Sequence, residues 1–519
     1  MDDETDWYPG LLSKQPLPYI NQKSSSKVVN KSVDAENKET YIDSIGQLTP
    51  NIDYFFKQRL TNREIPSNSG IEGSLFEDKN NPTDMVIGLD FGTSSVKVVL
   101  HDLNRNVFYA VPFFQVGIYN PYIFPSKVYL NHDRYSLESE DGGNACADLK
   151  MPLMGEYINT SNLVHTVAFL ALIIRHARGW LFSRHRDVYL STEIVWSLNL
   201  GLPAAYSENT KMSKQFKEIA LASINLSQHP ESVLTKDLVI RYLDFSRGQP
   251  SQLTNPLPVQ DDMVNVFPEI GAQVLAFIKS ESWDSKNRPF ITLVDIGAGT
   301  VDISFFSVQK NERQLTFRFF QNDVQTNGVI NLHRQRTNWL KAGLLNRGLL
   351  TPTIDSFFDE ISASTDQLLA IPENVEQYLY NLKLKGRNID FDFFKKYKYQ
   401  VYGLLHHTRQ NRLPLNNDIW RKLPIFLTGG GSRMQFYQRV INDVNSRESN
   451  WLHLEPDFLT KPGNLLADGL PSNEYDRLSV AYGLSFPQIG KIVPSWAIED
   501  ARRSDLPIRE RPIDPTDDG

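Results

Sequence analysis

The residues with the clearest chemical potential are two short segments that each join an aspartate to a glycine-containing turn. The first runs from Asp90 through Gly92 and carries the hydroxyl side chains of Thr93, Ser94 and Ser95. Glycine lets a turn approach a ligand closely, and successive backbone N–H groups can form a concavity that binds anions. An aspartate at the end of the preceding strand suits a hydrated magnesium ion. The segment predicts a phosphate-binding turn with Asp90 as a metal ligand; an ordinary tight hairpin is the alternative.

The second segment repeats this order of residue types, with Asp295 ahead of its glycine turn. Its candidate phosphate-binding residues are Gly297, Ala298, Gly299 and Thr300. It is not a dinucleotide fingerprint, because Asp302 stands where the third glycine would fall and a strand, not a helix, follows. Two turns that are each headed by an aspartate could hold a triphosphate from opposite sides. Asp295 is therefore a second candidate metal ligand.

The third segment is a glycine loop between the predicted strand Leu423–Leu427 and the predicted helix Met434–Val444. A strand, a glycine loop and a helix N-terminus together suit a nucleoside, because glycines leave room for a flat ring and the free N–H groups of the helix can meet phosphate. The candidate binding residues are Gly429, Gly430, Gly431, Ser432 and Arg433. A plain connecting loop is the alternative.

Strands and helices must position these segments. Apolar residues flank the first turn at Met85–Leu89 and Val96–Leu100, and the second turn lies inside the similar stretch Phe290–Val308. Each turn is therefore predicted to close a β-hairpin. The helices predicted from apolar periodicity include Asn162–Leu181, Ser213–Asn225, Val264–Ile278 and Arg477–Phe486.

Composition narrows the class of protein. The 519 residues carry 54 Lys and Arg against 61 Asp and Glu, and this acidic balance argues against a nucleic-acid partner. The single cysteine, Cys146, excludes an intramolecular disulfide and a multi-cysteine zinc site, and it fits the cytoplasm. The most apolar run, Val164–Ile174, is shorter than the ~20 residues that span a bilayer, so we expect a buried helix and no membrane segment.

In this order the three segments resemble the ATPase domain shared by actin, the sugar kinases and the seventy-kilodalton heat-shock chaperones. Ile87–Ser95 looks like the first phosphate motif, Leu293–Asp302 like the second, and Leu427–Arg433 like the adenosine motif. The resemblance covers roughly residues 84–488. It implies an α/β fold, namely a two-lobed actin-like ATPase built from duplicated ribonuclease H-like lobes with a nucleotide cleft between them.

The resemblance also implies a division of the chain. Residues 84–289 would form the first ATPase lobe, and residues 290–488 the second, with its final helix packed back on the first. Residues 1–83 are poor in large apolar side chains and predict a mostly disordered N-terminal extension. Residues 489–519 would form a C-terminal tail.

Several positions are more similar to the heat-shock-chaperone branch than to the others. Phe124–Ser126 resembles the start of a strand in the first lobe, and Val480–Gly483 resembles the helix that closes the domain. Lys150 falls where those chaperones place a phosphate-contacting lysine, with a solvated surface lysine as the alternative. Glu269 follows Pro268, the reverse of the family's order, and the resemblance implies that it is a magnesium or water ligand.

The resemblance implies a function as well as a fold. ATP and Mg²⁺ would bind between the lobes, with Asp90 and Asp295 positioning hydrated magnesium. The implied catalytic residues are Asp295, Glu269 and Lys150. Lys97 also follows the first turn, as in carbohydrate kinases, and we expect it on the outer face of its strand.

The match ends near residue 488, before any peptide-binding domain of the chaperone kind. We therefore expect an ATP-hydrolysing switch protein that acts through a protein partner, bound by residues 1–83 or by a lobe surface. An actin-like filament-forming ATPase and a small-molecule, carbohydrate-type kinase are the alternatives. Self-association is left open.

Overall fold

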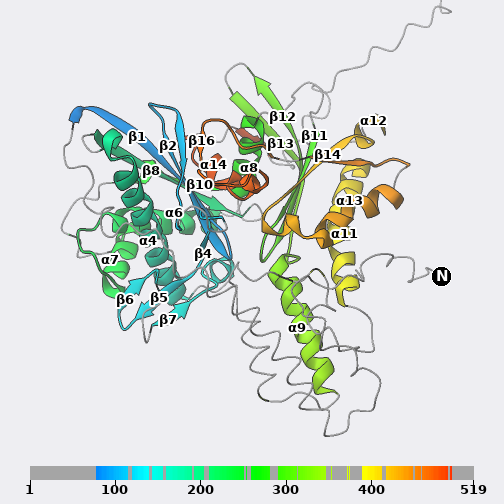
Figure 1. Ribbon diagram of the computed structural model, residues 1–519, viewed down its shortest axis with the longest axis horizontal. Helices are drawn as coiled ribbons and strands as arrows, with labels where there is room; N and C mark the ends of the chain where they lie inside the picture. The colour runs from blue at the N-terminus through cyan, green and yellow to red at the C-terminus, as the bar shows by residue number, and fades with distance from the viewer. Residues whose placement is uncertain are drawn as a thin grey trace, which may run out of the picture.

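The computed structural model is a mixed α/β fold whose described part contains three β-sheets (Figure 1). The described residues are 78–114, 120–138, 143–155, 159–189, 192–203, 210–249, 253, 259–280, 290–311, 314–346, 352, 371, 373, 389–411, 417–447, 450–457, 459–488 and 491–493. Residues 1–77 of the predicted N-terminal extension lie outside the described residues. The last six residues of the extension, 78–83, belong to strand β1 (Asp78–Phe91). The predicted tail, 489–519, lies outside them except for β17 (Lys491–Val493).

The first large sheet is organised around β1, which pairs in parallel with one neighbour and antiparallel with the other. Its strands, in spatial order, are β10 (Val264–Pro268), β8 (Thr192–Leu202), β1, β2 (Ser95–Asp102), β3 (Val107–Ala110) and β16 (Leu465–Leu466), with β4 (Phe124–Pro125) beside β2. Helices α4 (Thr160–Arg184) and α6 (Thr210–Ser227) share its core.

The apolar run Val164–Ile174 lies inside α4, most of whose residues are buried. The prediction of a buried helix is therefore confirmed. No helix in the described part of the chain is both long and apolar enough to cross a bilayer.

The second large sheet has the order β15 (Leu454–Asp457), β14 (Leu423–Thr428), β11 (Phe290–Ile296), β12 (Val301–Asn311), β13 (Gln314–Gln325) and β17. Helices α9 (Val329–Leu345), α11 (Ile389–Asn411) and α13 (Gln435–Arg447) lie around it (Figure 1). Large aromatic side chains fill the core between sheet and helices, and Trp420, Tyr397 and Tyr437 are fully buried there.

The predicted hairpins are present, and their turns have one geometry. The Gly92 N–H donates to the Ser95 carbonyl at 2.8 Å, and the Gly297 N–H donates to the Thr300 carbonyl at 2.9 Å. The strand registers also match, so that Asp90 lies opposite Lys97 just as Asp295 lies opposite Asp302.

One predicted helix begins five residues later than expected. The stretch Val264–Pro268 is strand β10, which pairs in parallel with β8, and helix α8 covers only Glu269–Lys279. A short apolar run fits a buried strand as well as a helix, so hydrophobicity alone could not separate the two elements. Pro268 at the helix N-cap marks the true boundary.

Helices α8 and α14 (Ser479–Leu484) lie between the two large sheets (Figure 1). Their backbones touch, because a Cβ on Gly483 would overlap the carbonyl group of Ala272. Helix α14 also lies directly on β1, where a Cβ on Gly88 would overlap the carbonyl of Ala481. Asn199 of β8 donates to the carbonyl of Leu484 at 2.7 Å, which ties the end of α14 to the first sheet.

This close packing predicts that Gly483→Ala destabilises the protein. The added methyl group has no room, and overpacking of this kind costs about 1–3 kcal/mol of the free energy of unfolding. Gly403→Ala in α11 is the matched control, since nothing lies within 4 Å of its Cβ position, and alanine there should leave stability unchanged or raise it. Urea unfolding measures both. Equal midpoints for Gly483→Ala and the wild type would contradict the packing argument.

Candidate functional site

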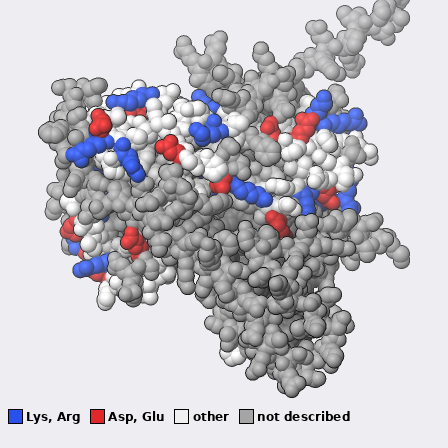
Figure 2. Space-filling view, viewed as in Figure 1, with Lys and Arg blue, Asp and Glu red and all other residues white. Residues whose placement is uncertain are grey.

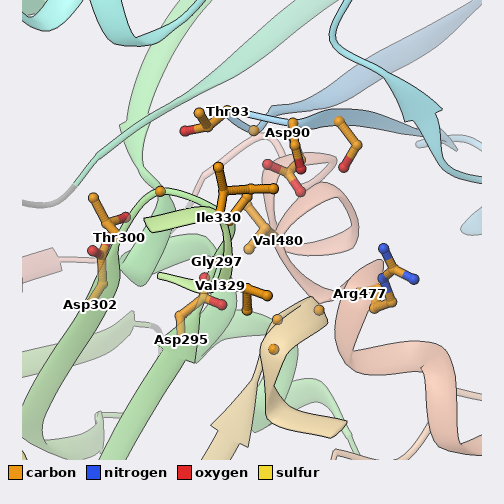
Figure 3. A pocket seen from close by; sticks show the side chains of 18 of the residues that line it. Asp90, Thr93, Asp295, Gly297, Thr300, Asp302, Val329, Ile330, Arg477 and Val480 are labelled. Carbon is orange, nitrogen blue, oxygen red and sulfur yellow. The ribbon is translucent and has the colours of Figure 1, made fainter. Parts of the chain in front are cut away.

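A cavity of about 400 Å³ lies where the three predicted segments meet (Figure 3). Asp90 and Thr93 reach it from the first hairpin, and Asp295, Thr300 and Asp302 from the second. The predicted site residues that line it are Asp90, Gly92, Thr93, Ser94, Ser95, Lys150, Glu269, Asp295, Gly297, Ala298, Gly299, Thr300, Gly429, Gly430, Gly431 and Arg433. Ser432 does not line it; the Ser432 hydroxyl instead donates to the Gly429 carbonyl at 2.8 Å.

The carbonyls of the second turn are engaged by α9, which orients its amides away from that helix. The carbonyls of Gly297 and Ala298 accept hydrogen bonds from the N–H groups of Val329 and Ile330 at 3.1 and 2.8 Å. The carbonyl of Gly299 accepts from the Asn331 side chain at 2.7 Å. In a trans peptide the next N–H points opposite to the carbonyl, so the amides of residues 298–300 point away from α9. This arrangement, beside the positive end of α9, suits an anion.

Ser126 supports the first turn in a similar way. Its hydroxyl donates to the Gly92 carbonyl at 2.8 Å, and its N–H donates to the Ser94 carbonyl at 3.0 Å. The two turns face each other across a narrow gap, because the side chain of Thr93 lies 3.6 Å from the Cβ position of Gly299. An anion in the cavity beside this contact would therefore be close to both turns.

The environment of three carboxylates that line the cavity, those of Asp295, Asp302 and Glu269, opposes their ionisation. Burial first, and then the charges of Asp302, Asp90 and Glu269, raise the pKa of Asp295 to about 8. Burial and the charge of Glu269 raise the pKa of Asp302 to about 7. The pKa of Glu269 is also raised, mainly by burial and then by Asp90, against the opposing charge of Lys150. Acidic groups that resist ionisation are thus concentrated beside turns that suit an anion.

Two lysines compensate part of this charge. The Nζ atom of Lys150 lies 2.5 Å from Oε1 of Glu269, and Nζ of Lys97 lies 3.0 Å from Oδ2 of Asp90. Lys150 is only 3% exposed, so its alternative as a solvated surface lysine is wrong. The expectation that Lys97 lies on the outer strand face is also wrong, because its side chain lines the cavity and pairs with Asp90 across the hairpin.

The carboxylates fit a hydrated cation better than one enclosed by protein ligands. Within the described ranges, no group of three or more His, Cys, Asp or Glu side chains could hold a metal ion directly. The Oδ1 atom of Asp302 is nevertheless buried without a hydrogen-bond partner. Burial and neighbouring acids raise the pKa of Asp295 and Asp302, and a cation in the cavity would counteract this effect. Magnesium keeps several waters in protein sites, so Asp90 and Asp295 fit an ion held through water.

The glycine loop after β14 closes the other end of the cavity. Gly429 has φ = 78°, and a Cβ there would overlap Oδ1 of Asp295, so only glycine fits. At Gly430 the space is open, and the nearest atom, Nη2 of Arg477, lies 3.7 Å from the Cβ position. Arg433 is held by Asp476, with its Nη2 2.6 Å from Oδ1. This end of the cavity therefore combines open space at Gly430 with the guanidinium groups of Arg433 and Arg477.

Sequence reasoning missed several residues that line the cavity. Asp302 was recognised as the end of the second motif but not predicted as a site residue, although its spacing from Asp295 equals that of Lys97 from Asp90. Gln273 lies one helical turn after Glu269 and donates to the Thr428 hydroxyl at 2.7 Å, and that spacing was a usable signal. Asp476, Arg477, Val329 and Ile330 also line the cavity, and nothing local in the sequence marks them.

Comparisons with protein-family models and with curated proteins return no match for this chain.

The raised pKa values predict that the ligand-free protein loses stability as pH rises. Asp295 and Asp302 bind protons more tightly in the folded chain than at their ordinary pKa of 3.8. Their contribution is therefore complete below about pH 4 and is lost as pH rises through about 7 and 8. We expect the free energy of unfolding, measured in urea, to fall between about pH 5 and pH 8.

Asp295→Asn cannot ionise, so its stability should fall less over the same range. Asp262→Asn, at an exposed position, is the control and should keep the wild-type pH dependence. A wild-type pH dependence in Asp295→Asn would contradict the assignment.

Proposed function

We propose that this chain binds ATP with Mg²⁺ in the cavity and hydrolyses it to ADP and phosphate. The observation that carries the proposal is that three segments far apart in the sequence line one cavity, which the first two enter from matching hairpins. Two sheets that each supply one aspartate–glycine hairpin also support a two-lobed actin-like arrangement, with lobes over residues 84–289 and 290–488.

The proposed position of the nucleotide follows from the groups that each wall offers. The phosphates lie between the two turns, where backbone amides and the hydroxyls of Thr93 and Thr300 are available. The nucleoside lies over Gly430, beside Arg433, where only the Arg477 side chain comes within 4 Å of the Cβ position. Magnesium, when bound, neutralises charge on the β- and γ-phosphate oxygens.

Hydrolysis needs placement and charge stabilisation more than covalent chemistry. A water oxygen forms the new bond to the γ-phosphorus, the bond to the bridging oxygen breaks, and the water proton passes to a carboxylate. Asp295 is our choice for that carboxylate, with Glu269 as its neighbour, because cationic charge entering the cavity favours ionisation of Asp295. Lys150 stabilises the negative charge of the phosphoryl group from the α8 side.

We further propose that the ATPase acts as a switch for a protein partner, as the resemblance to the chaperones implies. Lys and Arg are interspersed with Asp and Glu on the face shown in Figure 2. Because positive and negative side chains are mixed, the described part of this face has no electrostatic preference for a polyanion. Such a mixed surface is compatible with the binding of a protein partner.

The sharpest test of the proposed activity is phosphate release from Mg-ATP by the purified full chain with no acceptor added. Asp295→Asn should lower turnover roughly 10²–10⁴-fold, because it removes the group that receives the proton. Asp295→Asn, purified in the same way, also controls for contaminating ATPases. Asp262→Asn, at an exposed position, should keep wild-type turnover and controls for the effect of substitution itself.

Undiminished turnover in Asp295→Asn would overturn the role of Asp295. ATP binding by the wild type without phosphate release would overturn intrinsic hydrolysis and favour the kinase alternative. Sedimentation with ATP then separates a switch from a filament.

A further inference from the structure

The chain passes from the second large sheet to the first between β15 and β16. Asp457, the last residue of β15, pairs with Phe426 in the second sheet. Leu465, the first residue of β16, pairs with Phe108 of β3 at the outer edge of the first sheet. We call residues 459–470 the strap. None of these described residues lines the cavity, so contact with a nucleotide does not account for the crossing.

Hydrogen bonds fasten the strap to the first sheet and to α14. The Phe108 N–H donates to the Asn464 carbonyl at 3.1 Å. The Tyr482 hydroxyl, on α14, donates to the side-chain oxygen of Asn464 at 3.2 Å. The Tyr122 hydroxyl donates to the Asp468 carbonyl at 2.6 Å. Both tyrosines are buried, so their hydroxyl groups depend on the strap for a partner rather than on bulk water.

Two leucines of the strap pack where the large sheets meet. Leu459 and Leu465 are 8% and 1% exposed, and they belong to one hydrophobic core. The same core contains Phe108 of the first sheet and Phe317 and Phe319 of β13 in the second. The strap is therefore packed in the junction between the sheets, beside α14 (Figure 1).

The strap is short and internally braced. Residues 460–463 separate its two anchored parts. The N–H of Leu465 donates to the Pro462 carbonyl at 3.1 Å, which closes a turn, and the proline ring fixes φ at the start of that turn. The Lys461 ammonium donates to the carbonyl of Leu465 at 2.9 Å. A segment braced in this way has little slack, so it restrains the sheets that it joins.

The strap leads directly into the wall of the cavity. The short helix η8 (Ser472–Arg477) follows it and carries Asp476 and Arg477 to the glycine-loop end of the cavity. Glu474 of the same helix is buried and accepts a hydrogen bond from the Asn120 side chain. A change in how the strap lies therefore displaces this wall as well.

We infer that the strap limits how far the two large sheets separate and thereby slows the exit of nucleotide from the cavity. Its hydrogen bonds fix it on the first sheet, and Leu459 fixes it in the core between the sheets. The sheets separate widely only when these contacts break. The restraint belongs to the chain without ligand, whereas its effect on nucleotide exit rests on the proposed function.

Spin labels measure the restraint without any nucleotide. Lys214→Cys on α6 and Asn442→Cys on α13 place them at exposed positions on opposite sides of the junction, in a full chain that also carries Cys146→Ser. Double electron–electron resonance on the intact strap should give one narrow distribution of distances. The double variant Tyr122→Phe/Tyr482→Phe removes only two hydroxyl groups, and it should add a second population of distances.

The same double variant tests the effect on nucleotide exit. N-methylanthraniloyl-ATP is bound to the full chain with Mg²⁺ and chased with excess ATP, and stopped-flow fluorescence measures its release. One hydrogen bond changes an equilibrium roughly two- to tenfold, so the loss of two should speed release roughly four- to hundredfold.

Two further variants make the result specific. Tyr242→Phe removes a hydroxyl that lies 3.0 Å from Nδ1 of His229, in α7 (Lys236–Ser246) and outside the strap, and it should match the wild type in both measurements. Insertion of Gly-Ser after Gly463, where nothing lies within 4 Å of the Cβ position, lengthens the strap and should act like the double variant. Urea unfolding identifies any variant that fails to fold.

The outcomes separate this inference from the function on which part of it rests. A wild-type distribution of distances in the folded double variant would overturn the inference, whatever the release rate. A second population with unchanged release would overturn its part about nucleotide exit. Failure of the wild type to bind the fluorescent nucleotide would overturn the proposed function, and the distances would still decide whether the strap restrains the sheets.

Discussion

The close contact of three backbones holds the two large sheets at the separation that the cavity requires. Gly483 of α14 lies against the carbonyl of Ala272 in α8, and Gly88 of β1 lies against the carbonyl of Ala481. A six-residue helix such as α14 has little stability of its own, because helix nucleation is costly. It is stable here because its apolar residues belong to a core that includes side chains from both sheets.

Polar side chains complete that junction. The carbonyls of Leu484 and Phe486 accept hydrogen bonds from Asn199 at 2.7 and 2.8 Å, and the carbonyl of Ser485 lies 3.0 Å from Nδ1 of His101. Asn199 and His101 are both buried in the first sheet. An unpaired carbonyl in such a place costs free energy, so these contacts fix where α14 ends on that sheet. The position of the hairpins follows from this arrangement.

The cavity between the hairpins combines two opposing electrostatic demands. The amides of the turns favour an anion, whereas Asp295, Asp302 and Glu269 favour a cation and resist ionisation in its absence. Neither ligand alone satisfies the cavity, so anion and cation should assist each other's binding. The lysines at 97 and 150 reduce the imbalance and allow the acids to stay close together before any ligand arrives.

Local patterns in the sequence determined the hairpins, the buried helix α4 and the acidic, single-cysteine character of the chain, because each depends on neighbouring residues. The prediction of the side to which Lys97 points was wrong, because that side depends on the pairing register of the strand. The boundary between β10 and α8 was also missed, because an apolar run fits a strand as well as a helix. Only the tertiary structure decided that Asp302, Asp476 and Arg477 share a cavity with Asp90. It also decided that Asp295 is hard to ionise, because burial and like charge act through space between residues far apart in the chain.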